Sequence, residues 1–301
     1  MDDSKQATTK LLDRALSNLA GLFTASLTLV CLLLVSSGRQ ALAQQVTKST
    51  PSNVPSKLPS KIPHGKPSTL PSKPTNPSND VQQLLLAGQA ALGNGRFDEA
   101  IATYNRVITL SSNNARNAAV ANLKIGNAYM VQRKFENAAI GYQRAATLNP
   151  DYAEAYNNLG EALGELKQYP RAIEAFNKAF NLDPKLLKAK YNQAVTYDRM
   201  GNFRYSEFVF RNLIKSSPDY SLAYDGLAVT LSKAGRAKEA ITFHEKAIAL
   251  NPREPSYYFN CAISYLMLRN TAKALEQQEK LKAIDPAIAD RLASVIVKRQ
   301  M

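Results

Sequence analysis

Apolar residues recur along most of this chain at steps of three and four, which places side chains on one face of an α-helix. One such series runs from Tyr156 to Leu163, and a second runs from Ala172 to Ala179. A few polar or glycine residues separate the two series, so together they predict a helix, a short turn and an antiparallel helix. The same pair of series returns several times between residues 81 and 288.

Prolines end most of these pairs at a fixed interval. Five of them are spaced 34 residues apart, and each follows Asn, Asp or Ser: Pro150, Pro184, Pro218, Pro252 and Pro286. The residue before a proline is pushed out of helical backbone angles, so each of these dipeptides predicts the end of a helix. A fixed period of this length is typical of a solenoid, in which each copy buries its apolar face against its neighbours.

The chain resembles the tetratricopeptide repeat family in three stretches, GNAYMVQRKFENAAIGYQRAATLNP, NNLGEALGELKQYPRAIEAFNKAFNLDP and DGLAVTLSKAGRAKEAITFHEKAIALNP. The resemblance covers residues 81–286 almost continuously and implies an all-α, right-handed α-solenoid. We place six helix-turn-helix units at 81–114, 119–152, 153–186, 187–220, 221–254 and 255–288. A C-terminal capping helix is expected to follow and to end over residues 289–301.

Two details of the pattern predict how the repeats pack. Ser112 stands where the other units have proline, and four extra residues, 115–118, separate the first unit from the second, which favours a tilted or loosely docked first repeat. One position of the first helices always holds a small residue, which we expect to face the small residues of the second helix. These residues are Gly88, Gly126, Gly160, Ala194, Ala228 and Ala262.

The N-terminal part of the chain does not show the repeat pattern. Residues 19–35, LAGLFTASLTLVCLLLV, form an uncharged apolar run that basic residues precede and Ala41-Leu42-Ala43 follows. This order predicts an export signal that is cleaved after Ala43. The run also approaches the length of a membrane span, so residues 1–43 are either a signal peptide or an uncleaved anchor that contacts the membrane through residues 19–35. In both interpretations we expect the repeats to be exported, to a periplasm, a lumen or the cell surface.

Residues 44–80 are rich in Pro, Ser, Thr and Lys and hold no aromatic residue. Such a composition cannot bury enough apolar surface to offset its ordering entropy, so we expect a disordered linker. The formal net charge of the whole chain is +14, which favours protein partners that are acidic or membrane-associated. Lys and Arg are scattered over every repeat without a basic block, so we expect no nucleic-acid partner.

No sequence motif for catalysis is present, and no metal-ligand spacing or cofactor motif is found. Glu161 and Glu165 lie four residues apart, but in a first helix we expect them to serve recognition rather than acid–base chemistry. His244 replaces an aromatic residue on a core face, so we expect a structural role for it. The sequence therefore predicts a protein that is not an enzyme and that holds no metal and no cofactor.

The resemblance implies a peptide-binding groove, because the first helices of this family line a concave surface. Apolar residues are expected at both ends of the groove and charged residues in its middle, which suits an extended peptide or a helix. The groove residues are Leu85, Gln89, Leu123, Asn127, Met130, Asn157, Asn158, Glu161, Lys188, Tyr191, Asn192, Val195, Arg199, Asp225, Val229, Phe259 and Ile263, with Val131, Leu222 and Met267 at further groove positions.

One subclass of the family grips the terminal carboxylate of a peptide with Lys, Asn and Arg side chains. This chain offers Asn127, Asn158 and Lys188 at matching positions, but Leu123 and Asn192 stand where a Lys and an Arg are needed. The clamp is incomplete, so the sequence disfavours carboxylate capture.

The sequence thus predicts a non-catalytic scaffold for protein–protein interaction that helps to assemble an extracytoplasmic complex. Two alternatives remain at this point. One is a membrane-anchored assembly or trafficking factor. The other is a recognition module that serves a separate glycan-handling enzyme.

Overall fold

The computed structural model describes residues 77–300, which belong to one compact unit, Pro71–Met301. The predicted signal peptide or anchor, residues 1–43, and nearly all of the predicted linker, residues 44–80, lie outside the described residues. Within the described range, no helix combines the length and the apolar character that crossing a membrane requires.

Thirteen α-helices and no β-strand make up the described residues. The first helices of successive pairs are α2 (Pro77–Gly93), α4 (Ala115–Val131), α6 (Ala153–Glu165), α8 (Leu187–Arg199), α10 (Ser221–Lys233) and α12 (Pro255–Met267). The second helices are α3 (Phe97–Leu110), α5 (Phe135–Leu148), α7 (Tyr169–Leu182), α9 (Phe203–Ser216), α11 (Ala237–Leu250) and α13 (Thr271–Lys282), and α14 (Pro286–Gln300) follows them. The predicted all-α solenoid with a final capping helix is confirmed. Helix α2 begins at Pro77, inside the range that the sequence assigns to the linker.

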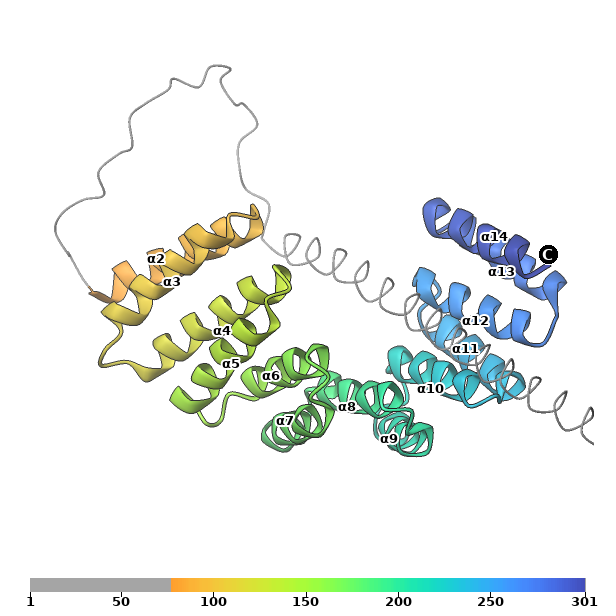
Figure 1. Ribbon diagram of the computed structural model, residues 1–301, viewed down its shortest axis with the longest axis horizontal. Helices are drawn as coiled ribbons and strands as arrows, with labels where there is room; N and C mark the ends of the chain where they lie inside the picture. Colours follow the sequence, from red (N-terminus) through yellow and green to blue (C-terminus); the bar gives the residue numbers. More distant parts are fainter. Residues whose placement is uncertain (1–76, 301) are drawn as a thin grey trace, which may run out of the picture. The chain divides into compact units, whose positions relative to one another are not determined.

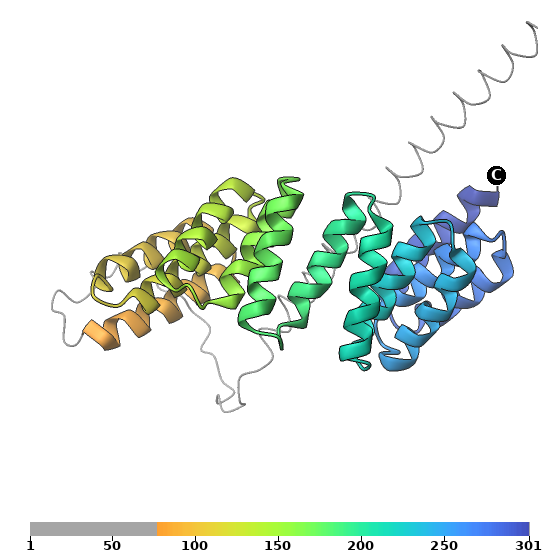
Figure 2. The same ribbon diagram turned by 90° about the horizontal axis from the view of Figure 1, so that it is seen from below.

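Each helix contacts its neighbours in sequence, as a solenoid requires. In the middle of the curved row, α6 and α8 lie on its inner side and α7 and α9 on its outer side (Figure 1). Figure 2 shows the pairs following one another along the row. Helices α6, α8, α10 and α12 also contact one another directly, so their side chains share one inner face.

The turn inside each pair places one residue in the left-handed region of backbone angles. The six residues are Gly95, Gly201 and Gly235, at φ of 72°, 74° and 81°, and Arg133, Lys167 and Arg269, at φ of 60°, 59° and 57°. The amide of the next residue then bonds back across the end of the first helix, as the Gln168 amide does to the Leu163 carbonyl at 2.9 Å. This closure fixes where the second helix starts, and it recurs even where glycine is absent.

Aromatic rings of the second helices pack directly onto glycines of the first helices. A Cβ atom added to Gly160 would lie 2.6 Å from the ring of Phe176, and Gly126 meets Tyr142 at the same distance. Small residues of the second helix are expected to face these glycines, and Gly141 does so, since a Cβ atom added to it would lie 3.0 Å from Gly126. The expectation did not include the aromatic rings, which also pack onto the glycines. The glycine is required because an aromatic ring fills the place that its side chain would occupy.

The first repeat packs against the second through buried apolar residues, so the expectation of loose docking is wrong, while the expected tilt stays a prediction. The extra residues 115–118 form the first turn of α4 rather than a spacer, and Ala118 is buried there. Tyr104 and Val107 of α3 share a buried cluster with Ala121 and Ile125 of α4. The buried contacts between α3 and α4 therefore form although Ser112 stands where the other units have proline.

The junction between the third and fourth repeats is polar. Gln193 and Lys190 of α8 occupy the positions that Leu159 and Tyr156 hold in α6. The Gln193 amide donates to Asn177 Oδ1 at 2.8 Å, and Lys190 Nζ donates to the same oxygen at 3.2 Å. Burial lowers the pKa of Lys190. This junction is held by hydrogen bonds where its neighbours bury apolar surface.

The described core consists of clusters that run along the row of helices, and the cluster nearest the N-terminus starts at Val81. The other clusters that described residues form lie further along the chain, and their members all follow Val81. Because every cluster is built from neighbouring repeats, we expect residues 71–301 to fold without the preceding residues.

The contact between Gly160 and Phe176 makes a direct test of this packing. We predict that Gly160→Ala lowers the free energy of unfolding by roughly 1–3 kcal/mol, because the buried ring has no space into which it can move. Gly164→Ala in the same helix is the control, since its nearest neighbour would be Arg199 Nη1 at 3.9 Å. Urea denaturation followed by circular dichroism measures both, and equal stability of the two variants would contradict the packing.

Candidate functional site

A ladder of asparagine side chains connects the inner faces of α4 and α6. Asn127 Oδ1 accepts a hydrogen bond from the Tyr142 hydroxyl at 2.8 Å and a longer one from Asn158 Nδ2 at 3.4 Å. Asn157 Nδ2 in turn donates to Asn158 Oδ1 at 3.1 Å. The side chains on this stretch of the inner face are therefore oriented by one another.

Glu161 of α6 extends the ladder and links α6 to α8 through hydrogen bonds. Its Oε1 atom accepts from Asn157 Nδ2 at 2.9 Å and from Asn192 Nδ2 at 2.9 Å. Lys188 Nζ lies 2.7 Å from the same oxygen. Asn192 Nδ2 also donates to Asn157 Oδ1 at 3.1 Å. Glu161 thus serves to position side chains of the neighbouring repeat.

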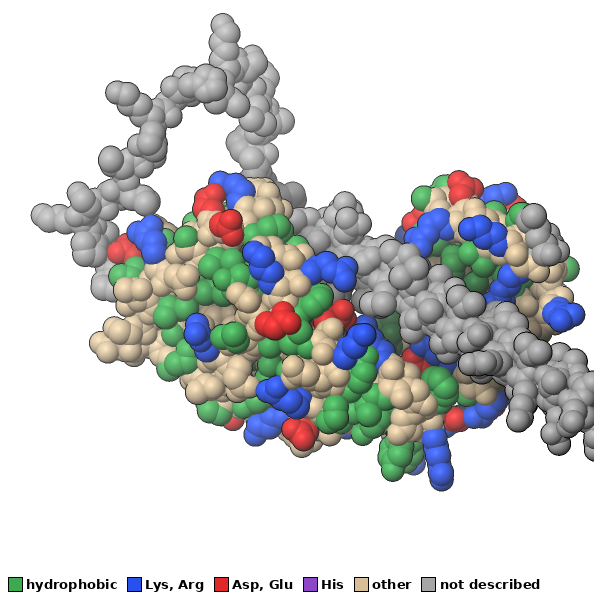
Figure 3. Space-filling model, in the orientation of Figure 1, with side chains coloured by type: hydrophobic (Ala, Val, Ile, Leu, Met, Phe, Trp, Pro, Cys, Tyr) green, Lys and Arg blue, Asp and Glu red, His purple; other side chains and the backbone are tan. Residues whose placement is uncertain are grey.

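Ion pairs continue this pattern toward the C-terminus. Arg199 Nη1 lies 3.0 Å from Glu165 Oε1, and Lys233 pairs with Asp198. Near α6 and α8, acidic and basic side chains lie side by side on the surface (Figure 3). The charges that the sequence places in the middle of the groove therefore neutralise one another across successive first helices. The Lys188 side chain remains 50% exposed and is the most accessible charge of these pairs.

Asp225 of α10 forms a separate set of polar contacts inside the protein. It accepts from Asn260 Nδ2 at 3.0 Å, and its other oxygen lies 2.8 Å from His244 Nδ1. His244 is 1% exposed, which agrees with the structural role expected for it. Hydroxyls of Ser232 and Ser264 form a further bond between α10 and α12 at 2.8 Å.

Four predicted groove residues are buried and cannot contact a ligand directly: Leu123, Asn157, Asp225 and Phe259. They share one position, the fifth of the units that begin at 119, 153, 221 and 255. The contacts of Asn157 and Asp225 run to the following first helix, which shows the reason. Each pair is rotated relative to the previous one, so the fifth position points toward the next repeat and not into the open groove.

Tyr191, at the fifth position of the fourth repeat, is half-buried for the same reason. Its ring packs edge-on against Phe210 at 5.7 Å and against Tyr220 at 6.4 Å between ring centres. Replacing Tyr191 would disturb the core of the fourth and fifth repeats, so its removal cannot test ligand binding alone.

The remaining predicted residues lie at least partly open on the first helices. Lys188 is exposed, and the half-buried ones are Leu85, Gln89, Asn127, Met130, Asn158, Glu161, Asn192, Val195, Arg199, Val229 and Ile263. Three apolar residues of the first helices are more open still: Val131 at 63%, Leu222 at 40% and Met267 at 37% exposed. These three offer the apolar contact that an incoming peptide can use.

Two cavities lie on the other side of the row, between second helices. One, of about 260 Å³, lies between α3 and α5 over Ile125 and Tyr129, and the other, of about 280 Å³, lies between α5 and α7 over Leu159 and Leu163. Their lining residues occupy equivalent positions of successive repeats, so the cavities follow from the stacking itself. They carry no arrangement of reactive side chains.

Asn260 takes part in the contacts of Asp225 but was not among the predicted groove residues. Asparagine stands at the same repeat position in Asn158, Asn192 and Asn260. This recurrence of asparagine is the sequence signal that could have identified Asn260 as a residue of the inner face. The recurrence does not tell which atoms each side chain bonds.

The helix pairs, their common turn and their inner face define an all-α repeat solenoid. Two sequence models of the tetratricopeptide repeat family match the chain, one over residues 79–115 and 123–185 and the other over residues 223–256. The chain is a member of the tetratricopeptide repeat family, whose repeats serve as scaffolds for protein–protein interaction.

Relatives include anaphase-promoting complex subunit 3 of Schizosaccharomyces pombe, 25% identical over 162 residues. That match covers 54% of this chain and 24% of the relative. Human mitochondrial import receptor subunit TOM70 is 25% identical over 213 residues, which is 68% of this chain and 35% of the relative. The chain therefore spans about a quarter to a third of the length of these relatives.

Solved structures share the fold. A tetratricopeptide repeat protein from Parabacteroides merdae is 20% identical, with a TM-score of 0.61, and the match covers 74% of this chain and 87% of that one. The type IV pilus biogenesis factor PilW is also 20% identical, with a TM-score of 0.60 and coverage of 72% and 98%. At this identity the likeness concerns the fold alone.

The ladder predicts a difference between two equivalent tyrosines. The Tyr142 hydroxyl bonds Asn127, whereas the buried Tyr104 hydroxyl has no hydrogen-bond partner among the described residues, because Gln89 stands where Asn127 would be. Burial raises the pKa of Tyr104 to about 12. We predict that Tyr142→Phe lowers the free energy of unfolding by about 0.5–1.5 kcal/mol, while Tyr104→Phe leaves it unchanged or raises it. Thermal and urea unfolding measure both, and the opposite order would contradict the assigned bonds.

Proposed function

We propose that this protein is a non-catalytic scaffold that holds an extended peptide or a helix of a partner protein along the inner face of its first helices. The proposal rests on one observation, the series of side-chain hydrogen bonds and ion pairs that joins each first helix to the next from Asn127 of α4 to Asn260 of α12. Its amides and carboxylates are held in fixed orientations before any partner arrives, so binding costs little side-chain entropy there. Exposed apolar residues at both ends of the series supply the contact area.

Pairing of the groove charges bears on the kind of ligand. Glu161, Glu165 and Asp198 are each neutralised by a cation of the next repeat. A ligand that carries polar backbone groups and apolar side chains can bind without displacing these pairs, whereas a free carboxylate would have to compete with Glu161 for Lys188. The geometry thus favours an internal segment of a partner over its C-terminus.

The names of the relatives support a role in multiprotein assemblies. One is named as a subunit of a complex, and the other as a subunit of an import receptor. We infer a similar role for this chain, in which the partner is another protein and the assembly lies outside the cytoplasm. The predicted export signal in residues 1–43 supports this placement, and the alternative is an anchored factor that keeps its apolar run.

Groove variants test the proposal. The groove variant combines Val131→Ser, Leu222→Ser and Met267→Ser in residues 71–301, which serve as bait in a native extract. We expect this variant to capture at least about ten-fold less partner protein than the wild type, because exposed apolar contacts are lost. These residues are exposed, so the melting temperature should change little. Quantitative mass spectrometry of the captured proteins is the measurement.

The matched control carries Leu275→Ser and Val297→Ser, which are similarly exposed but lie on α13 and α14. Proteins retained by the wild type and the control but lost from the groove variant support the inner face as the binding site. Equal capture by all three chains would refute it.

N-terminal sequencing of the protein purified from its own cells separates the two membrane interpretations. We expect Gln44 as the first residue, because the Ala41-Leu42-Ala43 sequence suits a signal peptidase. A chain that retains residues 19–35 and partitions with membranes would instead support the anchored factor.

A further inference from the structure

The outer face of α9 carries an exposed aromatic pair. Phe208 is 63% exposed and Tyr205 is 56% exposed, and they lie three residues apart, so they are neighbours on the helix surface. The Tyr205 ring stacks on Tyr197 of α8, with 5.5 Å between ring centres, which holds it in place. Two large aromatic side chains are thus displayed to solvent on a second helix.

Stacking of the repeats does not require these aromatic residues. Repeats three, five and six build the same helix pair with polar or charged side chains at the two positions. Those residues are Arg171 and Glu174, Glu239 and Thr242, and Lys273 and Glu276. Aromatic residues that the fold does not need, exposed side by side, indicate an interaction surface.

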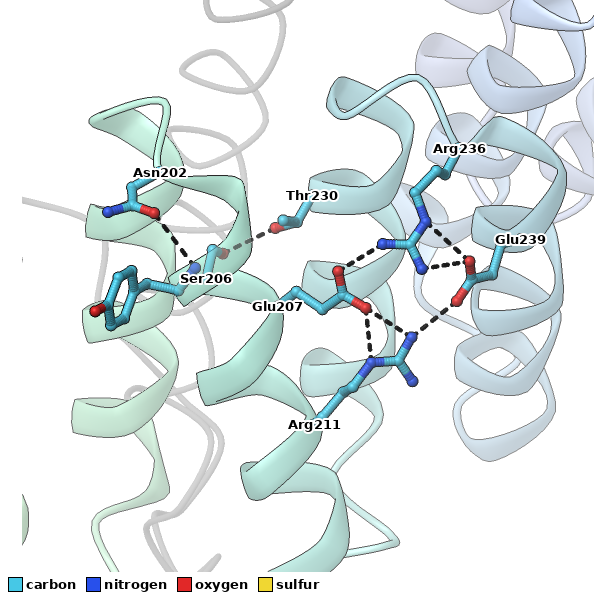
Figure 4. A network of polar contacts seen from close by, with 8 residues as sticks. Asn202, Ser206, Glu207, Arg211, Thr230, Arg236 and Glu239 are labelled. Carbon is cyan, nitrogen blue, oxygen red and sulfur yellow. Dashed lines mark hydrogen bonds and ion pairs between the residues drawn. The ribbon is translucent and has the colours of Figure 1, made fainter.

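The surface around the aromatic pair carries unneutralised positive charge. Glu207 is the only acidic residue of α9, and it binds Arg211 at 2.8 Å and Arg236 at 2.6 Å (Figure 4). Glu239 of α11 pairs with the same two arginines, so these four charges balance and the excess positive charge comes from other residues. Burial opposes ionisation of Glu207, but the hydrogen bonds from the two arginines outweigh it and lower the pKa of this carboxyl. Arg204 and Lys215 of α9 are exposed and have no carboxylate partner within the part of the chain that the structure describes.

Arg204 and Lys215 share a face of α9 with Phe208. Arg204 precedes Phe208 by four residues, which is one turn, and Lys215 follows it by seven, which is two turns. One face of this helix therefore presents aromatic rings between two free cations.

The outer face of α9 differs from the outer faces of the second and third repeats. The cavities beside α5 and α7 are open at the equivalent positions of the second and third repeats. In the fourth repeat the stacked Tyr197 and Tyr205 rings take up that place, over the hydrogen-bonded side chains of Gln193 and Lys190. Phe208 and the stacked Tyr205 are both more than half exposed, so they present ring surface to solvent, which suits a flat partner better than an extended chain.

We propose that the outer face of α9 docks onto the anionic surface of a lipid bilayer. Phe208 and Tyr205 enter the headgroup region, where aromatic side chains are favoured, while Arg204 and Lys215 lie against lipid phosphates. A second copy of this chain fits poorly, because two identical faces would bring the cations together. The inner face of the first helices stays open for a partner protein, so this surface acts independently of the proposed groove.

A single tryptophan tests the proposal, because the chain has none of its own. We introduce Phe208→Trp into residues 71–301 and add vesicles of phosphatidylcholine and phosphatidylglycerol in equal parts. We expect a blue shift of the emission and quenching by brominated acyl chains, both absent with phosphatidylcholine alone. A matched reporter, Leu275→Trp on α13, should show neither change.

Charge variants complete the test. Arg204→Glu with Lys215→Glu, in the Phe208→Trp background, should weaken vesicle binding at least about ten-fold, since each cation contributes about five-fold near an anionic surface. Lys238→Glu with Lys246→Glu changes the net charge equally on α11 and should leave binding within about two-fold. Circular dichroism verifies that each variant is folded.

Three results would overturn the proposal. The first is that neither vesicle composition shifts the tryptophan fluorescence emission of the Phe208→Trp variant. The second is equal loss of binding in both charge variants, which would reduce the effect to net charge. The third is a blue shift with an acidic amphipathic peptide in the absence of any shift with vesicles, which would assign the face to a protein.

Discussion

The close approach of paired helices is the constraint on which the rest of this structure depends. In the first three repeats it is made possible by a glycine of the first helix that lies under an aromatic ring of the second. Gly226 plays the same part between repeats, since a Cβ atom there would lie 2.5 Å from Phe210. These contacts let first and second helices pack closely within a pair and, at Gly226, between pairs, so that successive first helices lie near enough for their side chains to bond.

Side chains about one repeat length apart in sequence therefore become neighbours on the inner face. Glu165 and Arg199 are 34 residues apart, and Asp198 and Lys233 are 35 apart. A groove built from such pairs is polar but locally neutral, and its free energy of binding has to come from preorganisation and apolar contact more than from net charge. Arg204 and Lys215, which have no carboxylate partner among the described residues, lie away from this groove, on α9.

Sequence periodicity sufficed for the helix pairs, the order of the elements and the recurrence of the turn, because each depends on residues close together in the chain. It failed for the fifth position of the units. Leu123, Asn157, Asp225 and Phe259 have the spacing of groove residues, yet they are buried, because the rotation from one pair to the next decides which repeat they face. That rotation arises from packing between repeats, and the polar junction at Gln193 and Lys190 shows how much such packing varies within one period.

A double-mutant cycle on Glu165 and Arg199 tests most directly whether successive first helices form one continuous inner face. Unfolding free energies of Glu165→Gln, Arg199→Met and the double variant give the coupling energy between the two side chains. We predict a coupling of roughly 0.5–1 kcal/mol, and none between Glu165 and Lys246, which lies on an outer helix two repeats away. Strict additivity of Glu165→Gln and Arg199→Met would contradict the account.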